Sequence, residues 1–292
     1  MKRKDDIIFD TINYILLLIV TFLTIYPFYY ILVISFNDGL DASRGGIYFW
    51  PRLFSLDNYK KLIFDIKWLN SFKVSVIRTV LGTVFTVAFT SVVAYGMSNK
   101  KLLFRKAYHT VLIFSMYFSG GLIPYYILLK KLGMLNSMSV YIIPSLLSPF
   151  LVLIMVSFFQ DVPEALSEAA KIDGASDLKI FVRIILPIST PVLATAALFT
   201  AVGQWNSWID SAYFVTEPKL RTMSYHLMEI INKSLALNSG EGNQAAYLQS
   251  LSVTTKSLQS AAIIIATVPI LTVYPFLQKY FVKGIMLGSV KE

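Results

Sequence analysis

Long apolar stretches alternate with short polar segments along this chain. A helix that crosses a bilayer needs about 20 mostly apolar residues. Six stretches reach that length. We therefore expect an all-α integral membrane protein with six transmembrane helices, over residues 12–36, 72–97, 107–129, 138–159, 188–215 and 258–282.

Two of these stretches contain residues that disturb a helix. Pro144 and Pro149 interrupt the fourth, and neighbouring groups must then satisfy the backbone carbonyls that each proline frees. The sequence "SGGLIP" at 119–124 predicts a bend in the third. The alternative is that these glycines serve close helix packing.

The composition supports a membrane protein. Hydrophobic residues make up 55% of the chain and charged residues only 15%, against about 25% charged in soluble domains. The absence of cysteine excludes disulfides and thiolate metal sites. His109 and His226 are too far apart to form a metal motif. A net charge of +9 fits cations near lipid headgroups better than nucleic-acid binding.

The distribution of lysine and arginine indicates an orientation. The basic groups at 2–4 and 99–106 favour cytoplasmic placement by the positive-inside rule. The outer segments also carry cations, but they are longer, so the density of lysine and arginine is higher in the inner segments. We predict cytoplasmic termini at 1–11 and 283–292, a cytoplasmic loop at 161–187, and outer loops at 37–71 and 216–257. Within the last, an amphipathic helix is expected over 221–237, followed by a turn at 238–243.

The cytoplasmic loop contains "EAAKIDGASDLKIFVRIILP" at 168–187. We expect a short helix capped by Asp161, with Glu164 in capping-box spacing. Gly174 suits a left-handed position after that helix, and Ser176 can cap a second one. Two interpretations fit: a stiff projection shaped for a partner, or an amphipathic helix lying on the headgroups.

The same loop carries a complete family pattern. The pattern is Glu-Ala-Ala, then three residues, Gly, nine residues, Ile, one residue and Leu-Pro. The chain matches it at Glu168, Ala169, Ala170, Gly174, Ile184, Leu186 and Pro187. This pattern resembles the signature loop of ABC importer permeases. "SFN" at 35–37, "GLIPYYILLKKLGMLNS" at 121–137 and "QWNSW" at 204–208 are similar to the maltose-type, carbohydrate-uptake branch. Within it, permeases for complex oligosaccharides and polysaccharide fragments look closest.

The resemblance implies a type I ABC importer permease fold with a cytoplasmic coupling helix. Glu168 would make polar contacts with a cytoplasmic ATPase subunit, and Ala169 and Ala170 would allow close approach. Gly174 would provide the turn, and Asp173 belongs to the same coupling segment. The implied partners are a second related permease in a heterodimer, two ATPase subunits and an extracellular solute-binding protein. The tail would also reach toward the ATPases.

No phosphate-binding G-x-x-x-x-G-K-[ST] pattern occurs in the chain. We therefore expect a non-catalytic subunit that binds no cofactor itself. ATP and magnesium would be bound by the partner ATPases.

Candidate residues for a substrate pathway lie in the fifth predicted span. "GQWNSWIDS" at 203–211 offers hydrogen-bonding groups and aromatic faces that suit a sugar: Gln204, Trp205, Asn206, Ser207, Trp208 and Asp210. A continuous helix would place Gln204, Ser207 and Trp208 on one face. The alternative is hydrogen bonding between helices with interfacial tryptophans.

Arg78 in the second span has two interpretations as well. It could attract an acidic sugar such as a uronic acid, or it could extend to the headgroups. The function predicted is a permease of a bacterial cell-membrane importer that takes up an oligosaccharide by ATP-driven alternating access. The alternatives are a secondary transporter and a membrane docking or sensor protein. The spans lack the paired acids suited to ion coupling, which counts against the former.

Overall fold

The computed structural model describes residues 4–238 and 255–289, and the regular structure in these ranges is helical. Two compact units divide the chain. One comprises Met1–Leu69 and Leu227–Pro269, and the other comprises Asn70–His226 and Ile270–Glu292.

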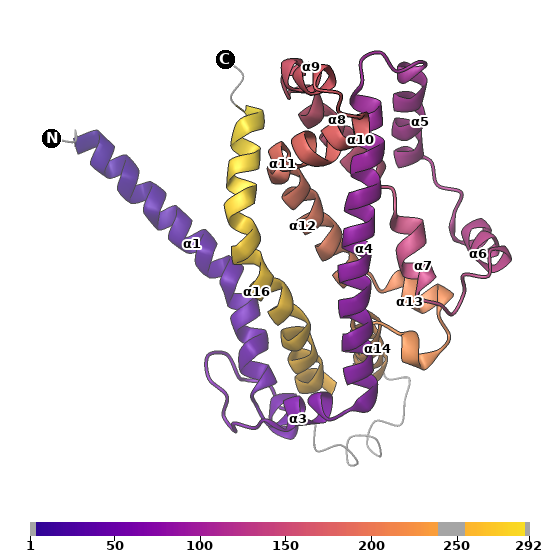
Figure 1. Ribbon diagram of the computed structural model, residues 1–292. Helices are drawn as coiled ribbons and strands as arrows, with labels where there is room; N and C mark the ends of the chain where they lie inside the picture. The colour runs from indigo at the N-terminus through magenta and orange to yellow at the C-terminus, as the bar shows by residue number, and fades with distance from the viewer. Residues whose placement is uncertain (1–3, 239–254, 290–292) are drawn as a thin grey trace. The chain divides into compact units, whose positions relative to one another are not determined.

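The first unit holds the long helix α1 and a loop that is fixed to the end of α1. Its helices are α1 (Lys4–Ser35), α2 (Gly39–Ser43), α3 (Asp57–Ile63), the part of α14 (Met223–Asn238) from Leu227 on and the first part of α16 (Thr255–Ser289) (Figure 1). Asn37 is buried and donates to the Asp41 carboxylate at 2.9 Å, while its side-chain oxygen accepts from the Leu53 amide at 3.0 Å. Asn58 donates to the Ser35 and Asn37 carbonyls. The loop after α1 is therefore held by buried amide side chains.

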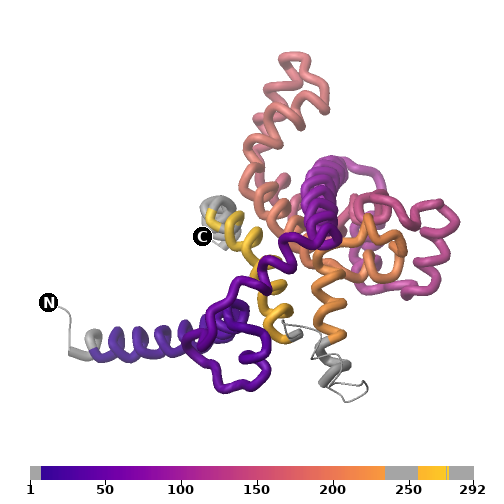
Figure 2. Tube along the Cα trace, turned by 90° about the horizontal axis from the view of Figure 1, so that it is seen from below, coloured from indigo at the N-terminus to yellow at the C-terminus, as the bar shows by residue number. Residues whose placement is uncertain are grey.

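The second unit is organised along α4 (Ile66–Ser98), which Figure 2 views nearly end-on. Shorter helices follow: α5 (Arg105–Tyr117), α6 (Leu122–Lys131), α7 (Ser139–Ile142), η1 (Ile143–Ser145), α8 (Pro149–Gln160), α9 (Glu164–Ile172), α10 (Asp177–Ile180), η2 (Phe181–Ile185), α11 (Leu186–Ile188), α12 (Thr190–Asn206), α13 (Ile209–Phe214) and η3 (Pro218–Leu220). The chain then enters α14 (Met223–Asn238), where an amphipathic helix is predicted. The turn predicted at 238–243 extends beyond the described residues.

Broken helices supply half of the candidate spans. Three single helices in the described ranges are long and apolar enough to cross a membrane: Ile8–Ser35, Ile66–Ser98 and Lys256–Val273. Three bent pairs qualify if each is counted as one span, with bends of 113° between α5 and α6, 45° before α8 and 80° before α12. The all-α membrane fold is confirmed. The number of candidate spans reaches the predicted six when each bent pair is counted as one span, but the last pair joins Asp177–Ile188 to Thr190–Asn206 and so differs in its bounds from the predicted 188–215.

The bend in the third span lies at the predicted glycines. Gly121 has a φ of +86°, a conformation that side chains disfavour. A Cβ added to Gly120 or Gly121 would meet nothing within 4 Å. These glycines therefore serve the bend and make no close packing contact with the described residues.

The fifth span differs from the sequence prediction. Its helix α12 ends at Asn206, Ser207 is extended, and α13 starts at Ile209. The continuous helix expected to 215 is thus interrupted, and Gln204, Ser207 and Trp208 do not share one helical face. The break frees the Ser207 carbonyl, which accepts a hydrogen bond from Arg78 at 3.0 Å.

A hydrophobic core joins α4, α8, η2 and α12 at one end of the second unit. Its buried members are Ala94, Met97, Leu151, Val152, Met155, Val156, Phe159, Ile180, Phe181, Ile185, Val192 and Ala196. Tyr95 stacks on Phe181 with ring centroids 4.8 Å apart. This core anchors the helices that flank the 161–187 loop.

Candidate functional site

The 161–187 loop forms a short helix, a tight turn and a second helix. Gly174 has a φ of +75° and follows the last residues of α9. The Ala175 amide donates to the Ala170 carbonyl at 2.9 Å, and the Gly174 amide donates to the Lys171 carbonyl at 3.0 Å. This pair of bonds is a Schellman motif. The Ser176 side chain accepts from the Lys179 amide and caps α10, so the predicted roles of Gly174 and Ser176 in the turn are confirmed.

The predicted cap at Asp161 is wrong. Asp161 ends α8 instead, and α9 begins at Glu164 after Pro163, which offers no side-chain cap. Proline is suited to a helix start because it lacks the amide hydrogen that would remain unsatisfied there. Glu164 forms an ion pair with Lys100 at 2.7 Å. The hydrogen bond and charge of Lys100 hold the pKa of Glu164 below its usual range.

The second half of the loop returns to the core through a π-helical turn. Residues Phe181–Ile185 form this turn, which ends two residues before Pro187. Because Pro187 has no amide hydrogen, it cannot continue the α-helical bonding pattern. Ile184 and Leu186 are half-buried against the hydrophobic core. These two residues of the family pattern therefore fix the loop to the unit.

The first half of the loop presents its pattern residues to the outside. Glu168, Ala169, Asp173 and Gly174 are exposed, while Ala170 is half-buried. Two apolar side chains next to them are also exposed, Ile172 at 86% and Leu178 at 70%. In Figure 1, α9 lies at the same end of this unit as the loop between α4 and α5. A rigid turn with an exposed apolar and polar surface is suited to contact with another protein.

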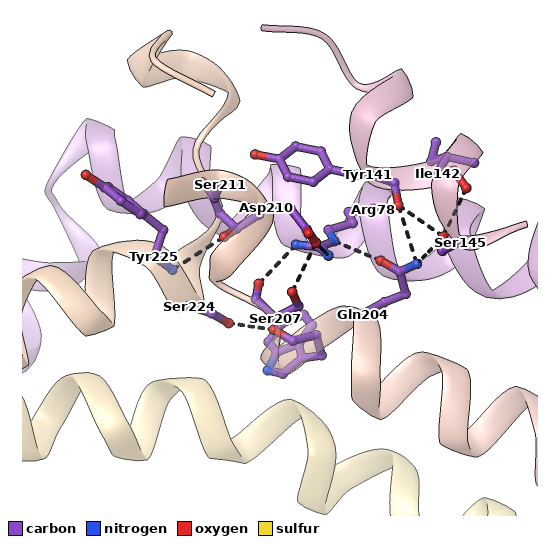
Figure 3. A network of polar contacts seen from close by, with 12 residues as sticks. Arg78, Tyr141, Ile142, Ser145, Gln204, Ser207, Asp210, Ser211, Ser224 and Tyr225 are labelled. Carbon is purple, nitrogen blue, oxygen red and sulfur yellow. Dashed lines mark hydrogen bonds and ion pairs between the residues drawn. The ribbon is translucent and has the colours of Figure 1, made fainter. Parts of the chain in front are cut away.

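A second site surrounds the buried guanidinium of Arg78 (Figure 3). Arg78 is 2% exposed. Its Nε donates to Gln204 Oε1 at 2.8 Å, and its Nη2 pairs with the Asp210 carboxylate. The Ser207 hydroxyl also donates to Asp210, at 3.0 Å. The headgroup interpretation of Arg78 does not fit, because its charge is satisfied within the chain.

This polar network extends to the broken fourth span. Arg78 lies over the Tyr141 ring, 4.6 Å from its centroid, in a cation–π arrangement. Gln204 Nε2 donates to Ser145 Oγ at 2.8 Å and to the Tyr141 carbonyl at 3.4 Å. One amide side chain therefore joins Arg78 to the residues that precede the kink.

Side chains of α4 satisfy the carbonyls that the kink exposes. Pro149 cannot donate to the Ser145 carbonyl, four residues earlier. Thr86 Oγ1 donates to that carbonyl at 2.7 Å, and Thr90 Oγ1 donates to the Leu146 carbonyl at 3.3 Å. The expectation that neighbouring groups compensate for the prolines is met at Pro149.

Part of the network lines a cavity of about 580 Å³. Its wall includes Arg78, Gln204 and Asp210, together with aromatic rings and hydroxyl groups from Tyr125, Tyr141, Phe150, Phe199, Thr86, Ser145 and Thr200. Such a lining of aromatic faces and hydrogen-bonding groups can hold a polar organic ligand.

The other predicted pathway residues have different surroundings. Trp205 is buried with its ring against Phe72, at 6.0 Å between centroids. Asn206 is exposed, and Ser207 and Trp208 are half-buried; none of these four lines the cavity. Sequence reasoning missed Tyr141 and Ser145. The sequence did contain one signal for these contacts: serine and threonine residues in the second span, two of which, Thr86 and Thr90, bond to the kink before Pro149.

These features define a class of protein: a helical membrane protein with broken spans and a rigid loop exposed between two of them. The chain belongs to the family of binding-protein-dependent transport system inner membrane components, which matches residues 1–287. The prediction of an ABC importer permease is confirmed.

Three comparisons illustrate this likeness. Protein LplC of Bacillus subtilis (strain 168) is 38% identical over 290 residues, covering 99% of this chain and 97% of LplC. The polygalacturonan/rhamnogalacturonan transport system permease protein YtcP of the same organism is 34% identical over 292 residues, which cover 100% of this chain and 100% of YtcP. A crystal structure of a bacterial ABC transporter involved in import of the acidic polysaccharide alginate superposes with a TM-score of 0.85. It has 26% identity and covers 96% of this chain and 99% of that chain.

We predict unequal costs for removing either partner of the Arg78–Asp210 pair. Asp210→Ala leaves a buried guanidinium without its counter-ion and should destabilise the protein by about 3 kcal/mol. Arg78→Met should cost less, because the Asp210 side chain is 31% exposed and that of Arg78 only 3%. Thermal unfolding of the purified complex in detergent measures both losses.

The double variant Arg78→Met/Asp210→Ala is the control for this pair. It should be more stable than Asp210→Ala alone, because no unpaired charge remains buried. Additive losses in the double variant would contradict the coupling.

We also predict that Gly82→Ala disturbs the network through Gln204. A Cβ at Gly82 would lie 2.8 Å from Gln204 Cδ, so the amide must move from Arg78 and Ser145. The expected loss is about 1–2 kcal/mol in thermal unfolding. Gly96→Ala in the same helix is the matched control, since a Cβ there meets nothing within 4 Å. Equal stability of the two variants would refute the packing argument.

Proposed function

We propose that this chain is one of two permease subunits in an importer that carries an acidic oligosaccharide into the cytoplasm. A solute-binding protein would deliver the sugar, and two ATPase subunits would bind ATP and magnesium. The observation that carries the proposal is the complete family pattern in the 161–187 loop, held on a rigid turn with Glu168, Ala169 and Gly174 exposed.

The 161–187 loop is proposed as the link to the ATPases. Ala169 and Ala170 leave little bulk beside Glu168, so a partner can approach the α9 backbone. The exposed Ile172 and Leu178 add apolar area that contact with a partner would remove from water. Because Ile184 and Leu186 pack on the core of the unit, a displacement of α9 would be passed to α8 and α12. This role requires the loop and both termini to be cytoplasmic.

The acidic character of the substrate rests on two relatives. One is a permease for polygalacturonan/rhamnogalacturonan and the other a structure concerned with the acidic polysaccharide alginate. In this chain, Arg78, Gln204 and Asp210 line the cavity beside Tyr125 and Tyr141, and we propose this wall as the part of the chain that meets the sugar. Trp205, Asn206, Ser207 and Trp208 stay predictions for the pathway.

The proposed mechanism is alternating access. The loaded binding protein would dock on the outer loops, and closure of the ATPases would move the 161–187 loop. The paired permeases would then open outward and accept the sugar, and ATP hydrolysis would reset the assembly. Against a secondary transporter, Asp210 in the described structure is paired with Arg78 and so is not poised as a lone proton or ion carrier. Against a docking or sensor protein stands the family assignment.

Substitution of Gly174 should uncouple the transporter. Gly174→Val forces a branched side chain into a left-handed conformation and should reduce substrate-stimulated ATPase activity at least about tenfold, since such strain can dismantle the turn. Gly174→Asn is the matched control, because asparagine tolerates this conformation, and it should retain more activity. Copurification of the four-subunit complex checks assembly. Full activity of Gly174→Val in an assembled complex would refute the role of the turn.

The choice of substrate can be tested with charge-matched ligands. We expect oligogalacturonides, presented by the cognate binding protein, to stimulate ATPase activity of the reconstituted complex. Their methyl esters keep the sugar backbone and lose the charge, so they should stimulate several-fold less, as expected when recognition depends on the carboxylates. Equal stimulation by ester and acid would exclude the acidic-sugar proposal while leaving the import function in place.

A further inference from the structure

The segment between α4 and α5 combines positive charge with exposed apolar side chains. Residues 99–106 read "NKKLLFRK" and include four cations and no acid. The segment begins directly after Ser98, the last residue of α4, and ends in the first turn of α5. Both helices belong to candidate membrane spans. Since helix ends of this kind lie at the level of the lipid headgroups, the segment is placed at the membrane surface.

Two large apolar side chains of this segment face outward. Leu103 is 72% exposed and Phe104 is 70% exposed. Phe104 has a φ of +57°, a left-handed conformation that is uncommon for a residue with a side chain. An exposed Leu-Phe pair is unfavourable in water but favourable at the boundary between headgroups and acyl chains.

Three of the four cations have no ion-pair partner within the described residues. Lys100 pairs with Glu164, whereas Lys101, Arg105 and Lys106 form no such pair there. Lys101 and Lys106 are exposed. The Nε of Arg105 is buried and has no hydrogen-bond partner in the described part of the chain. The exposed Lys101 and Lys106 are able to bind an anion that comes from outside the chain, and the half-buried Arg105 adds its charge beside them.

We propose that residues 99–106 form a binding site for an anionic phospholipid. Lys101, Arg105 and Lys106 bind the headgroup phosphate, and Leu103 and Phe104 enter the acyl boundary. Cations beside apolar side chains at a helix end match the two parts of a lipid, its charged head and its apolar chains. The Lys100–Glu164 pair places this site beside α9, so a bound lipid contacts the base of the proposed coupling segment. The site is independent of which sugar is carried.

The absence of cysteine from the chain allows a direct test. Leu103→Cys introduces one thiol into this chain for an environment-sensitive fluorophore, with the partner subunits made cysteine-free. The labelled complex is placed in vesicles of phosphatidylglycerol and phosphatidylcholine at fixed composition. Two preparations are compared, in which either the phosphatidylglycerol or the phosphatidylcholine carries bromine, which quenches the fluorophore on contact. Brominated phosphatidylglycerol should quench at least about twofold more than brominated phosphatidylcholine at equal mole fraction, because the cations enrich the anionic lipid.

Two charge variants carry the same label. Lys101→Gln/Arg105→Gln/Lys106→Gln should remove the preference for the anionic lipid. Lys67→Gln/Lys130→Gln/Lys131→Gln removes the same charge elsewhere and should leave it unchanged. Equal quenching by the two lipids, or equal losses in the two variants, overturns the proposal. If iodide in the aqueous phase quenches the label and the ATPase subunits protect it from iodide, this surface contacts a protein partner instead of lipid.

Discussion

The middle of the second unit depends on the hydrogen bonds and the ion pair that the buried guanidinium of Arg78 makes. Lipid offers no hydrogen bonds to the backbone, so the groups freed at a break in a membrane-spanning helix need a partner in the protein or in a water-filled cavity. Arg78 satisfies the Ser207 carbonyl at the end of α12, and Gln204 joins it to the kink at Ser145. Thr86 and Thr90 perform the same task for the carbonyls near Pro149. The breaks in the helices and the polar residues of α4 therefore belong to one arrangement.

The polar residues of the two candidate sites point in different directions. Those near Arg78 turn inward and bond to each other, which fixes the shape of the cavity wall. Those of α9 turn outward and leave Glu168 and Asp173 exposed. The hydrophobic core between α4, α8, η2 and α12 anchors the loop that carries α9. A movement imposed on α9 can therefore reach the helices of the core without first breaking a buried polar contact.

The sequence predicted the local structures that depend on single residue types. Gly174, Ser176 and the bend at Gly121 follow from backbone preferences and were found as expected. Contacts between distant segments were not predictable in this way. The length of an apolar run cannot reveal that α12 stops at Asn206, because the break is stabilised by Arg78, more than a hundred residues earlier. The family pattern identified the exposed loop from the sequence alone, whereas the pairing of Arg78 with Asp210 could be seen only in the folded structure.

The sidedness and contacts of the 161–187 loop test the account most directly. With the complex otherwise free of cysteine, Ile172→Cys would place the only thiol on the exposed face of α9. A membrane-impermeant maleimide should not react with it in intact cells. In inverted vesicles it should react rapidly, and more slowly once the ATPase subunits are bound. Labelling of intact cells, or a rate in inverted vesicles that the ATPase subunits leave unchanged, would contradict the proposed coupling role.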